Sequence, residues 1–287
     1  MRALAPALAA AWLAACGQDD GAAALARDIA ACEGGMFPEQ RLTACSAVIA
    51  NASAERWDRA DALVQRGMLR ASLGQHARAV ADFGRALRID ASLANAYAQR
   101  ALIHQERGAY DRAISDFDAA LALDPNMPAA IQGRAQVLSS QAQTFQSQID
   151  ALTQALLRTP DDAGLLNNRC WIRAVSGEEL DQALVDCNAA LLLEPANAAA
   201  LDSRGLVYLK LGAFESALAD YDAALAIEPG RGHYLYGRAM ARWGLGQPSE
   251  ADFAEAEAAE PAVSSLYASY RATPETLATG GAAPAQP

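Results

Sequence analysis

The residue types that most often carry chemistry are few and scattered in this chain. Its three histidines, His76, His104 and His233, lie far apart, and none has a Cys or His neighbour at metal-ligand spacing. The motifs G-x-S-x-G and H-E-x-x-H, the phosphate loop and the dinucleotide-binding fingerprint are absent from the sequence. The adjacent carboxylates Asp19 and Asp20 suit a solvated surface. We therefore expect no enzyme, no metal and no cofactor; an enzyme hidden in the repeats described below is one alternative.

Composition points to packed helices and away from nucleic acid. The chain has 287 residues, of which 52% are hydrophobic but only 6% aromatic. Much of the apolar share is alanine, which suits closely packed helices better than a sheet core rich in β-branched residues. The net charge is −11, with 34 acidic against 23 basic residues and no basic run. Nucleic-acid binding needs clustered Lys and Arg, so nucleic acid is not an expected partner.

The first residues resemble an export signal. They read MRALAPALAAAWLAAC, with one Arg before an apolar stretch that is shorter than the ~20 residues needed to span a bilayer. Residues 1–15 are predicted to be a signal peptide and residues 16–21 a linker. The last four letters resemble the lipobox of bacterial lipoproteins, which implies lipidation of Cys16. With Gly17 following it, the resemblance favours an outer-membrane anchor facing the periplasm. Soluble export and a cytoplasmic Ala-rich leader are the alternatives.

Four further cysteines fall into two local pairs, Cys32 with Cys45 and Cys170 with Cys187. Each pair is placed to join the two helices of one hairpin. Disulfides persist in oxidising compartments, so two such bonds agree with export. Closing a loop of about 15 residues would contribute ~3 kcal/mol in the chain-entropy model. The alternative is that the thiols are free and pack as small hydrophobic groups.

A fixed period is the strongest feature of the chain. Gly74 and Gly108 lie 34 residues apart, as do Ala79 and Ala113, and small, Gly, aromatic, Ala and Pro positions recur in the same order. This frame resembles the tetratricopeptide repeat (TPR), in which each repeat is a helix A and a helix B joined by a turn. Six repeats are predicted, at 60–93, 94–127, 128–162, 163–197, 198–231 and 232–261, and the third and fourth need an extra turn residue.

The resemblance implies an all-α fold, a right-handed TPR solenoid with caps at both ends. Residues 22–59 are predicted to be a degenerate capping hairpin, 262–271 a capping helix, and 272–287 a disordered tail. The frame places Ala135 in the core of helix A of the third repeat. It places Leu152 and Ala155 in the core of helix B of that repeat, and Ala258 in the core of the sixth.

Arginine recurs at position seven of helix A, and aspartate recurs at position twenty-three, on helix B. We interpret these residues as structural ion pairs between helices; a ladder of anion-binding arginines is the alternative. The third and sixth repeats have Ala151 and Ala254 in place of the aspartate. The expected pairs are Arg66 with Asp82, Arg100 with Asp116, Arg169 with Asp186, and Arg204 with Asp220.

In the TPR frame, helix A lines a concave groove that holds an extended peptide or a helix of another protein. The groove lacks the Lys/Asn/Arg set of TPRs that hold chaperone tails, which argues against such a partner. Trp171, Tyr236 and Trp243 are candidate hot spots, unless the tryptophans pack between repeats. The predicted partner-binding residues are Met68, Leu102, Gln136, Trp171, Leu206, Tyr236, Met240 and Trp243.

These observations predict a non-enzymatic scaffold of the bacterial cell envelope, held at the membrane through Cys16 and binding other proteins. A soluble periplasmic or cytoplasmic TPR co-chaperone or regulator is the second hypothesis. The absence of lipid on Cys16 would distinguish it from the first.

Overall fold

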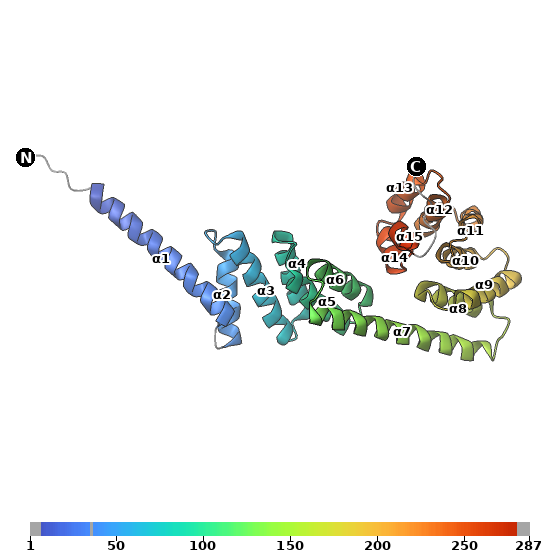
Figure 1. Ribbon diagram of the computed structural model, residues 1–287, viewed down its shortest axis with the longest axis horizontal. Coiled ribbons are helices and arrows are strands. Elements are labelled where there is room, and N and C mark those ends of the chain that lie inside the picture. Colours follow the sequence, from blue (N-terminus) through green and yellow to red (C-terminus); the bar gives the residue numbers. More distant parts are fainter. Residues whose placement is uncertain (1–6, 35–36, 280–287) are drawn as a thin grey trace, which may run out of the picture. The chain divides into compact units, whose positions relative to one another are not determined.

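The computed structural model describes residues 7–34 and 37–279, and their side chains over 21–34 and 37–278. All regular structure in these ranges is α-helical, which confirms the all-α fold class (Figure 1). The chain divides into two compact units, unit 1 (Met1–Ser139) and unit 2 (Ser140–Pro287). The helices are α1 (Ala7–Gly34), α2 (Pro38–Ala50), α3 (Arg56–Ser72), α4 (His76–Ile89), α5 (Ala94–Glu106), α6 (Tyr110–Leu123), α7 (Pro128–Leu156), α8 (Ala163–Ser176), α9 (Leu180–Leu193), α10 (Ala198–Lys210), α11 (Phe214–Ile227), α12 (Gly232–Gly244), α13 (Glu250–Ala259), α14 (Val263–Ser269) and α15 (Pro274–Thr279).

Consecutive helices pair as hairpins, α3 with α4 and α5 with α6 in unit 1, and α8–α9, α10–α11 and α12–α13 in unit 2. Glycines in the left-handed region end helix A of these hairpins. Gly74 follows α3 at φ 72° and Gly212 follows α10 at φ 71°. Residues with a Cβ seldom adopt this conformation, so the glycine spacing fixes where each helix A ends.

Small residues on helix A let helix B approach closely. A Cβ added at Gly67 would lie 2.7 Å from the ring of Phe83, and one added at Gly205 would lie 2.9 Å from that of Tyr221. Both rings are fully buried. The core of these two hairpins is therefore an aromatic ring of helix B set against a gap on helix A, which is why a small residue occupies this position.

The third repeat differs from the expected hairpin, because residues 128–156 form the single helix α7. The stretch between its two halves, residues 139–145, reads SSQAQTF and contains neither Gly nor Pro. Nothing there ends a helix, whereas the turns of the other repeats carry a glycine. The expected core residue Ala135 is consequently exposed, and Leu152 and Ala155 are only half-buried. The unit boundary falls within α7.

Each half of α7 packs within its own unit. In the first half, Ala130 and Val137 belong to the core around Phe117 of α6. In the second half, Leu156 joins the core of unit 2. The Oγ1 atom of Thr153 also accepts a hydrogen bond from Arg169 Nη1 on α8 at 3.0 Å. The two halves thus occupy the places of a helix A and a helix B without an intervening turn.

The sixth repeat has a shifted register in its second helix. Ala258, the expected core residue, is exposed, whereas Ala256 is fully buried. Asp252, four residues before Ala256, is also buried and comes six residues after Gly246, whereas Asp220 of the fifth repeat comes eight residues after Gly212. Two residues fewer in the turn move the buried face of α13 back by two positions, which a constant period could not reveal.

At the N-terminal end, the helix that opens the chain is longer than expected. Helix α1 begins at Ala7 and continues through residues 16–21, the expected linker, as alanine-rich sequence readily allows. It pairs with α2 over a small core that contains Cys32, Cys45 and Val48. Residues 1–6, 35 and 36 and the side chain of Cys16 lie outside the described part. Among described helices, none combines the length and the apolar character needed to cross a bilayer.

The C-terminal end is more ordered than predicted. Helix α15 occupies Pro274–Thr279, within the stretch expected to be disordered. Its start is capped reciprocally, because Thr273 N donates to Thr276 Oγ1 at 2.8 Å and Thr276 N donates to Thr273 Oγ1 at 3.3 Å. Such a capping box satisfies backbone donors that the first turn would otherwise expose. Residues 280–287 of the predicted tail lie outside the described residues.

Candidate functional site

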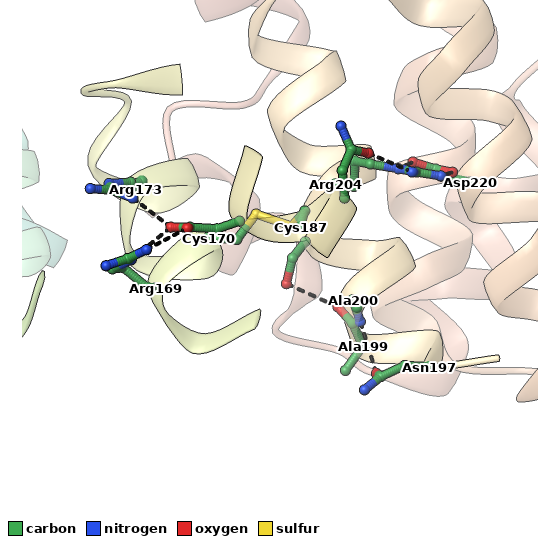
Figure 2. Close-up of a disulfide and its surroundings, with 12 residues drawn as sticks. Arg169, Cys170, Arg173, Cys187, Asn197, Ala199, Ala200, Arg204 and Asp220 are labelled. Carbon is green, nitrogen blue, oxygen red and sulfur yellow. Dashed lines mark hydrogen bonds and ion pairs between the residues drawn. A yellow bond between two sulfur atoms is a disulfide. The ribbon is translucent and has the colours of Figure 1, made fainter. Parts of the chain in front are cut away.

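Each of the four expected ion pairs is present as a two-pronged contact between helix A and helix B. In each, Nε and Nη2 of the arginine donate to the two oxygens of one aspartate (Figure 2 draws two of the pairs). The Nη2–Oδ1 distances are 2.7 Å for Arg66 with Asp82, 2.6 Å for Arg100 with Asp116, 2.6 Å for Arg169 with Asp186, and 2.7 Å for Arg204 with Asp220.

The aspartates of two of these pairs favour the cationic form of their arginines. The hydrogen bond to Asp186 raises the pKa of Arg169, and that to Asp220 raises the pKa of Arg204, against the opposing effect of burial. The remaining donor atoms point at the preceding repeat. Arg204 Nη1, for example, donates to Asn188 Oδ1 at 2.8 Å. Guanidinium groups engaged on both sides have few donors left for a ligand, so the geometry favours a structural role.

Three features of this network were not predicted from the sequence. A second arginine, four residues after the first, also binds the aspartate in three repeats, as Arg173 does with Asp186 in Figure 2. The signal was the i,i+4 spacing of the arginines, which places both on one helix face. In the sixth repeat Arg238 binds Asp252, with Nε–Oδ2 at 2.8 Å, because of the shifted register. In the third, Arg134 reaches back to Asp118 of α6.

Both predicted cysteine pairs are disulfides in the structure. Cys32 of α1 is bonded to Cys45 of α2, with their Cα atoms 4.7 Å apart, and Cys170 of α8 is bonded to Cys187 of α9, at 5.5 Å (Figure 2). All four side chains are buried. The second bond takes the place of the ring and small residue that fill the same positions in neighbouring repeats, so it ties helix A to helix B where the core is made.

The predicted partner-binding residues of unit 1 are accessible to different degrees. Met68 on α3 and Leu102 on α5 are half-buried at the edges of their cores, and Gln136 on the first half of α7 is exposed. We call the surface of α3, α5 and this part of α7 that carries these residues the helix A face of unit 1.

The corresponding surface of unit 2, the helix A face of α8, α10 and α12, is mostly covered. Leu206 and Met240 are fully buried and Tyr236 is 7% exposed, whereas Trp171 and Trp243 are half-buried. The repeat frame predicted that these residues share one surface, but it could not show that another part of the chain covers that surface. The covering element includes residues 263–279, which we call the C-terminal segment.

Aromatic contacts attach the C-terminal segment to this face. The Tyr267 ring lies 4.6 Å from that of Tyr236, centroid to centroid, and 4.9 Å from the imidazole of His233. Tyr270 lies 5.2 Å from Trp171. The Tyr267 hydroxyl donates to the carbonyl oxygen of His233 at 3.0 Å. Burial raises the pKa of Tyr267 well above its ordinary value, which fits a neutral phenol in this position.

A buried polar pair lies under the same segment. His233 Nδ1 is 3.0 Å from Asp202 Oδ1, and both side chains are largely enclosed. An aspartate beside a histidine can orient an imidazole for proton transfer. Here the ring is stacked among Tyr267, Tyr270 and Trp171, so packing accounts for it. Among the described residues, no group of three or more His, Cys, Asp or Glu side chains is placed to hold a metal ion.

The fold also brings together arginines that are separated in the sequence. Four arginines, two from the start of α3 and two from the end of α4, line a cavity of about 400 Å³ with Ile49, Leu63 and Ile89. Antiparallel pairing brings these helix ends together, although no basic run occurs in the sequence. The arrangement could accept an anionic group. The four residues are Arg56, Arg59, Arg85 and Arg88.

Comparison with known proteins identifies the repeats. The family "Tetratricopeptide repeat" matches residues 60–93, 94–127 and 198–231, three of the six frames expected from the period. Among curated proteins there is no match.

Similar solved structures include YrrB, described as a TPR protein with an unusual peptide-binding site, at 24% identity over 62% of this chain and 91% of that one, with a TM-score of 0.32. MamA is 17% identical over 72% and 94%, at 0.32. Pseudomonas aeruginosa PilF is 18% identical over 74% and 98%, at 0.35. Scores this low support no argument about function.

The turn glycines, the ring-and-gap cores and the matched family agree with one another. Stacked helix hairpins of this kind present extended surfaces to other proteins, and their usual role is protein–protein interaction. The chain contains tetratricopeptide repeats, and its fold is the all-α architecture that such repeats build.

Proposed function

We propose that the protein is a non-enzymatic scaffold of the bacterial cell envelope that binds a peptide or helix of a partner protein on its helix A faces. The observation that carries the proposal is the open helix A face of unit 1. There Gln136 is exposed and Met68 and Leu102 are half-buried beside it in the repeat frame. A surface that mixes apolar and amide groups, with few charges, suits an extended or helical protein segment.

The cell-envelope part of the proposal has separate support. Two disulfides, Cys32–Cys45 and Cys170–Cys187, join neighbouring helices, and such bonds persist in oxidising compartments. The N-terminal sequence ends its apolar stretch at Cys16, in a context that resembles a lipobox. Together these features favour export followed by anchoring of the chain through lipid on Cys16.

Site-specific photocrosslinking tests where partners bind. A photoreactive amino acid at Gln136, on the helix A face, is compared with one at Ser115, which is exposed on the helix B α6. We expect an envelope protein to be captured from position 136 and not from position 115, and a peptide of that protein to bind the purified chain. Equal capture from both positions would overturn the proposed surface. Capture of cytosolic proteins alone would overturn the location.

Lipidation is tested by metabolic labelling with palmitate. The wild-type chain should incorporate label and sediment with membranes, whereas Cys16→Ala should do neither. An unlabelled, soluble wild-type chain that still binds its partner would favour a soluble periplasmic or cytoplasmic regulator over the anchored scaffold.

A further inference from the structure

The C-terminal segment does more than cover the end of the last hairpin. A terminal cap has to shield only the exposed side of the final repeat, here α12 and α13. Tyr270 instead reaches Trp171 on α8, two repeats earlier, with the rings edge to face at an interplanar angle of 88°. Arg271 lies close enough to act electrostatically on Lys210 of α10. The segment therefore packs on α12 and reaches α8, and the charge of its Arg271 acts on α10.

The contacts are those of a bound helical ligand. Val263, Tyr267 and Ala272 of the segment are buried to 1% exposure or less. Tyr267 and Tyr270 are three residues apart, so both lie on one side of the chain as it leaves α14. Tyr267 inserts beside Tyr221, with their hydroxyl oxygens 3.3 Å apart, and stacks on Tyr236. The partner-binding residues predicted from the repeat frame, Trp171 and Tyr236, are thus occupied by the chain itself.

Other features work against this docking. Helices α14 and α15 have only seven and six residues, and helices this short are unstable unless they are docked. Arg271 adopts φ 54°, a left-handed conformation that a residue with a side chain seldom takes. Burial, and in second place the positive charge of Arg271, lower the pKa of Lys210 to about 8. Aromatic packing therefore favours the docked segment, whereas its short helices, the backbone of Arg271 and the charge near Lys210 disfavour it. This balance allows the segment to leave α12 without unfolding of the hairpins.

We propose that residues 263–279 are an internal ligand of the helix A face of unit 2, and that this face accepts from a partner a short helix bearing two aromatic side chains one turn apart, as Tyr267 and Tyr270 are. The partner binds by displacing the segment, so unit 2 is closed until a competing helix arrives. This inference rests on the proposed scaffold function and adds to it the chemical character of the partner and a means of regulation.

A peptide-binding experiment on the full-length chain tests the inference. The probe is a fluorescent peptide of residues 262–279, and its binding is followed by anisotropy. In the wild-type chain the attached segment competes at a high effective concentration, so the peptide should bind weakly. In a Tyr267→Ser/Tyr270→Ser chain the competitor is weakened, and the peptide should bind at least about tenfold more tightly. The same peptide with both tyrosines replaced by serine should not bind the variant.

Controls separate displacement from loss of folding. The helical circular dichroism of the variant should match that of the wild type. The single variant Tyr270→Ser, which leaves the buried Tyr267 in place, should show a smaller gain in the same direction. Adding Trp171→Ala to the double variant should weaken peptide binding about 2- to 10-fold, as the loss of one aromatic pair implies. Equal peptide affinity for wild type and both variants would overturn the inference.

Hydrogen exchange of the wild-type chain provides a second test. Amides of residues 263–279 should exchange faster than those of α12, because the segment opens without the hairpins. Exchange of the segment only together with α12 would show a permanent cap and overturn the inference. Neither measurement uses an external partner. Failure to crosslink at position 136 would therefore count against the proposed function. The inference about the C-terminal segment would still be decided by the peptide-binding and hydrogen-exchange measurements.

Discussion

Trp171 on α8 and Tyr270 after α14 meet edge to face, with their ring centroids 5.2 Å apart. Together with the contacts of Tyr267, this pair joins the fourth repeat directly to the C-terminal segment. An aromatic pair of this geometry contributes about 0.5–1.5 kcal/mol beyond its buried area. A free energy of this size helps to hold a short segment in place, and the aromatic ring of a competing helix can replace it.

Removing this ring contact should loosen the C-terminal segment alone. For Trp171→Ala we expect amides of residues 263–279 to exchange about 2- to 10-fold faster, which is what the loss of one aromatic pair implies. The matched variant is Trp243→Ala, a half-buried tryptophan of the same core for which no ring contact with the segment is found. It should leave exchange of the segment nearly unchanged. Similar effects of both variants would contradict the specific role of Trp171.

The buried ion pairs should dominate the stability of their hairpins. Asp186→Ala removes the buried carboxylate that Arg169 and Arg173 share, and leaves Arg169 with the Thr153 hydroxyl and Arg173 with the exposed Glu179. Removing one member of a buried pair typically costs about 3–5 kcal/mol. Asp118→Ala removes the exposed partner of Arg134 and should cost no more than about 1 kcal/mol. Urea denaturation followed by circular dichroism measures both, and equal midpoints would be inconsistent with this interpretation.

The disulfide of the fourth repeat should stabilise unit 2. Cys170→Ala/Cys187→Ala should lower the free energy of unfolding by about 3 kcal/mol, as the chain-entropy model gives for a loop of this size. Added reductant should destabilise the wild type and have no further effect on this bond in the variant. Four titratable thiols in the non-reduced wild-type chain would refute both bonds.

Lys210 should make the stability of unit 2 rise with pH in the alkaline range. Burial first, and the charge of Arg271 second, lower its pKa in the fold to about 8, from its ordinary value of 10.5. Between these values the unfolded chain binds more protons than the folded one, so the free energy of unfolding increases with pH. Lys210→Met should flatten the dependence between pH 8 and 10. A wild-type curve that falls over this window would contradict the assignment.

Two glycines of the first repeat should respond oppositely to alanine. At Gly67 the added methyl would lie 2.7 Å from Phe83, so Gly67→Ala should destabilise by about 1–3 kcal/mol. At Gly84, inside α4, the nearest side-chain atoms are 3.7 Å away or more, and alanine should stabilise the helix by about 0.5–1 kcal/mol. Thermal unfolding distinguishes them, and shifts of the same sign would contradict the ring-and-gap packing.

Local patterns in the sequence were sufficient where one element decides the outcome. Turn glycines such as Gly74 end a helix because of backbone sterics, and Arg169 with Asp186 recurs at a spacing that any hairpin of this length brings together. The same patterns failed where a repeat departs from the period. Helix α7 is continuous because its sequence lacks a turn glycine, and the buried face of α13 is shifted because the turn before it is shorter. A repeat frame of constant period predicts neither change.

The sequence by itself determined a stack of helix hairpins, their core positions outside the third and sixth repeats, and the pairing of Cys170 with Cys187. Only the tertiary structure decided which surfaces are open. Gln136 is exposed and Tyr236 is buried, although both occupy helix A, and the C-terminal segment that packs on α12 covers Tyr236. That contact joins residues far apart in the chain through nondirectional apolar packing, and such packing leaves no periodic signal in the sequence.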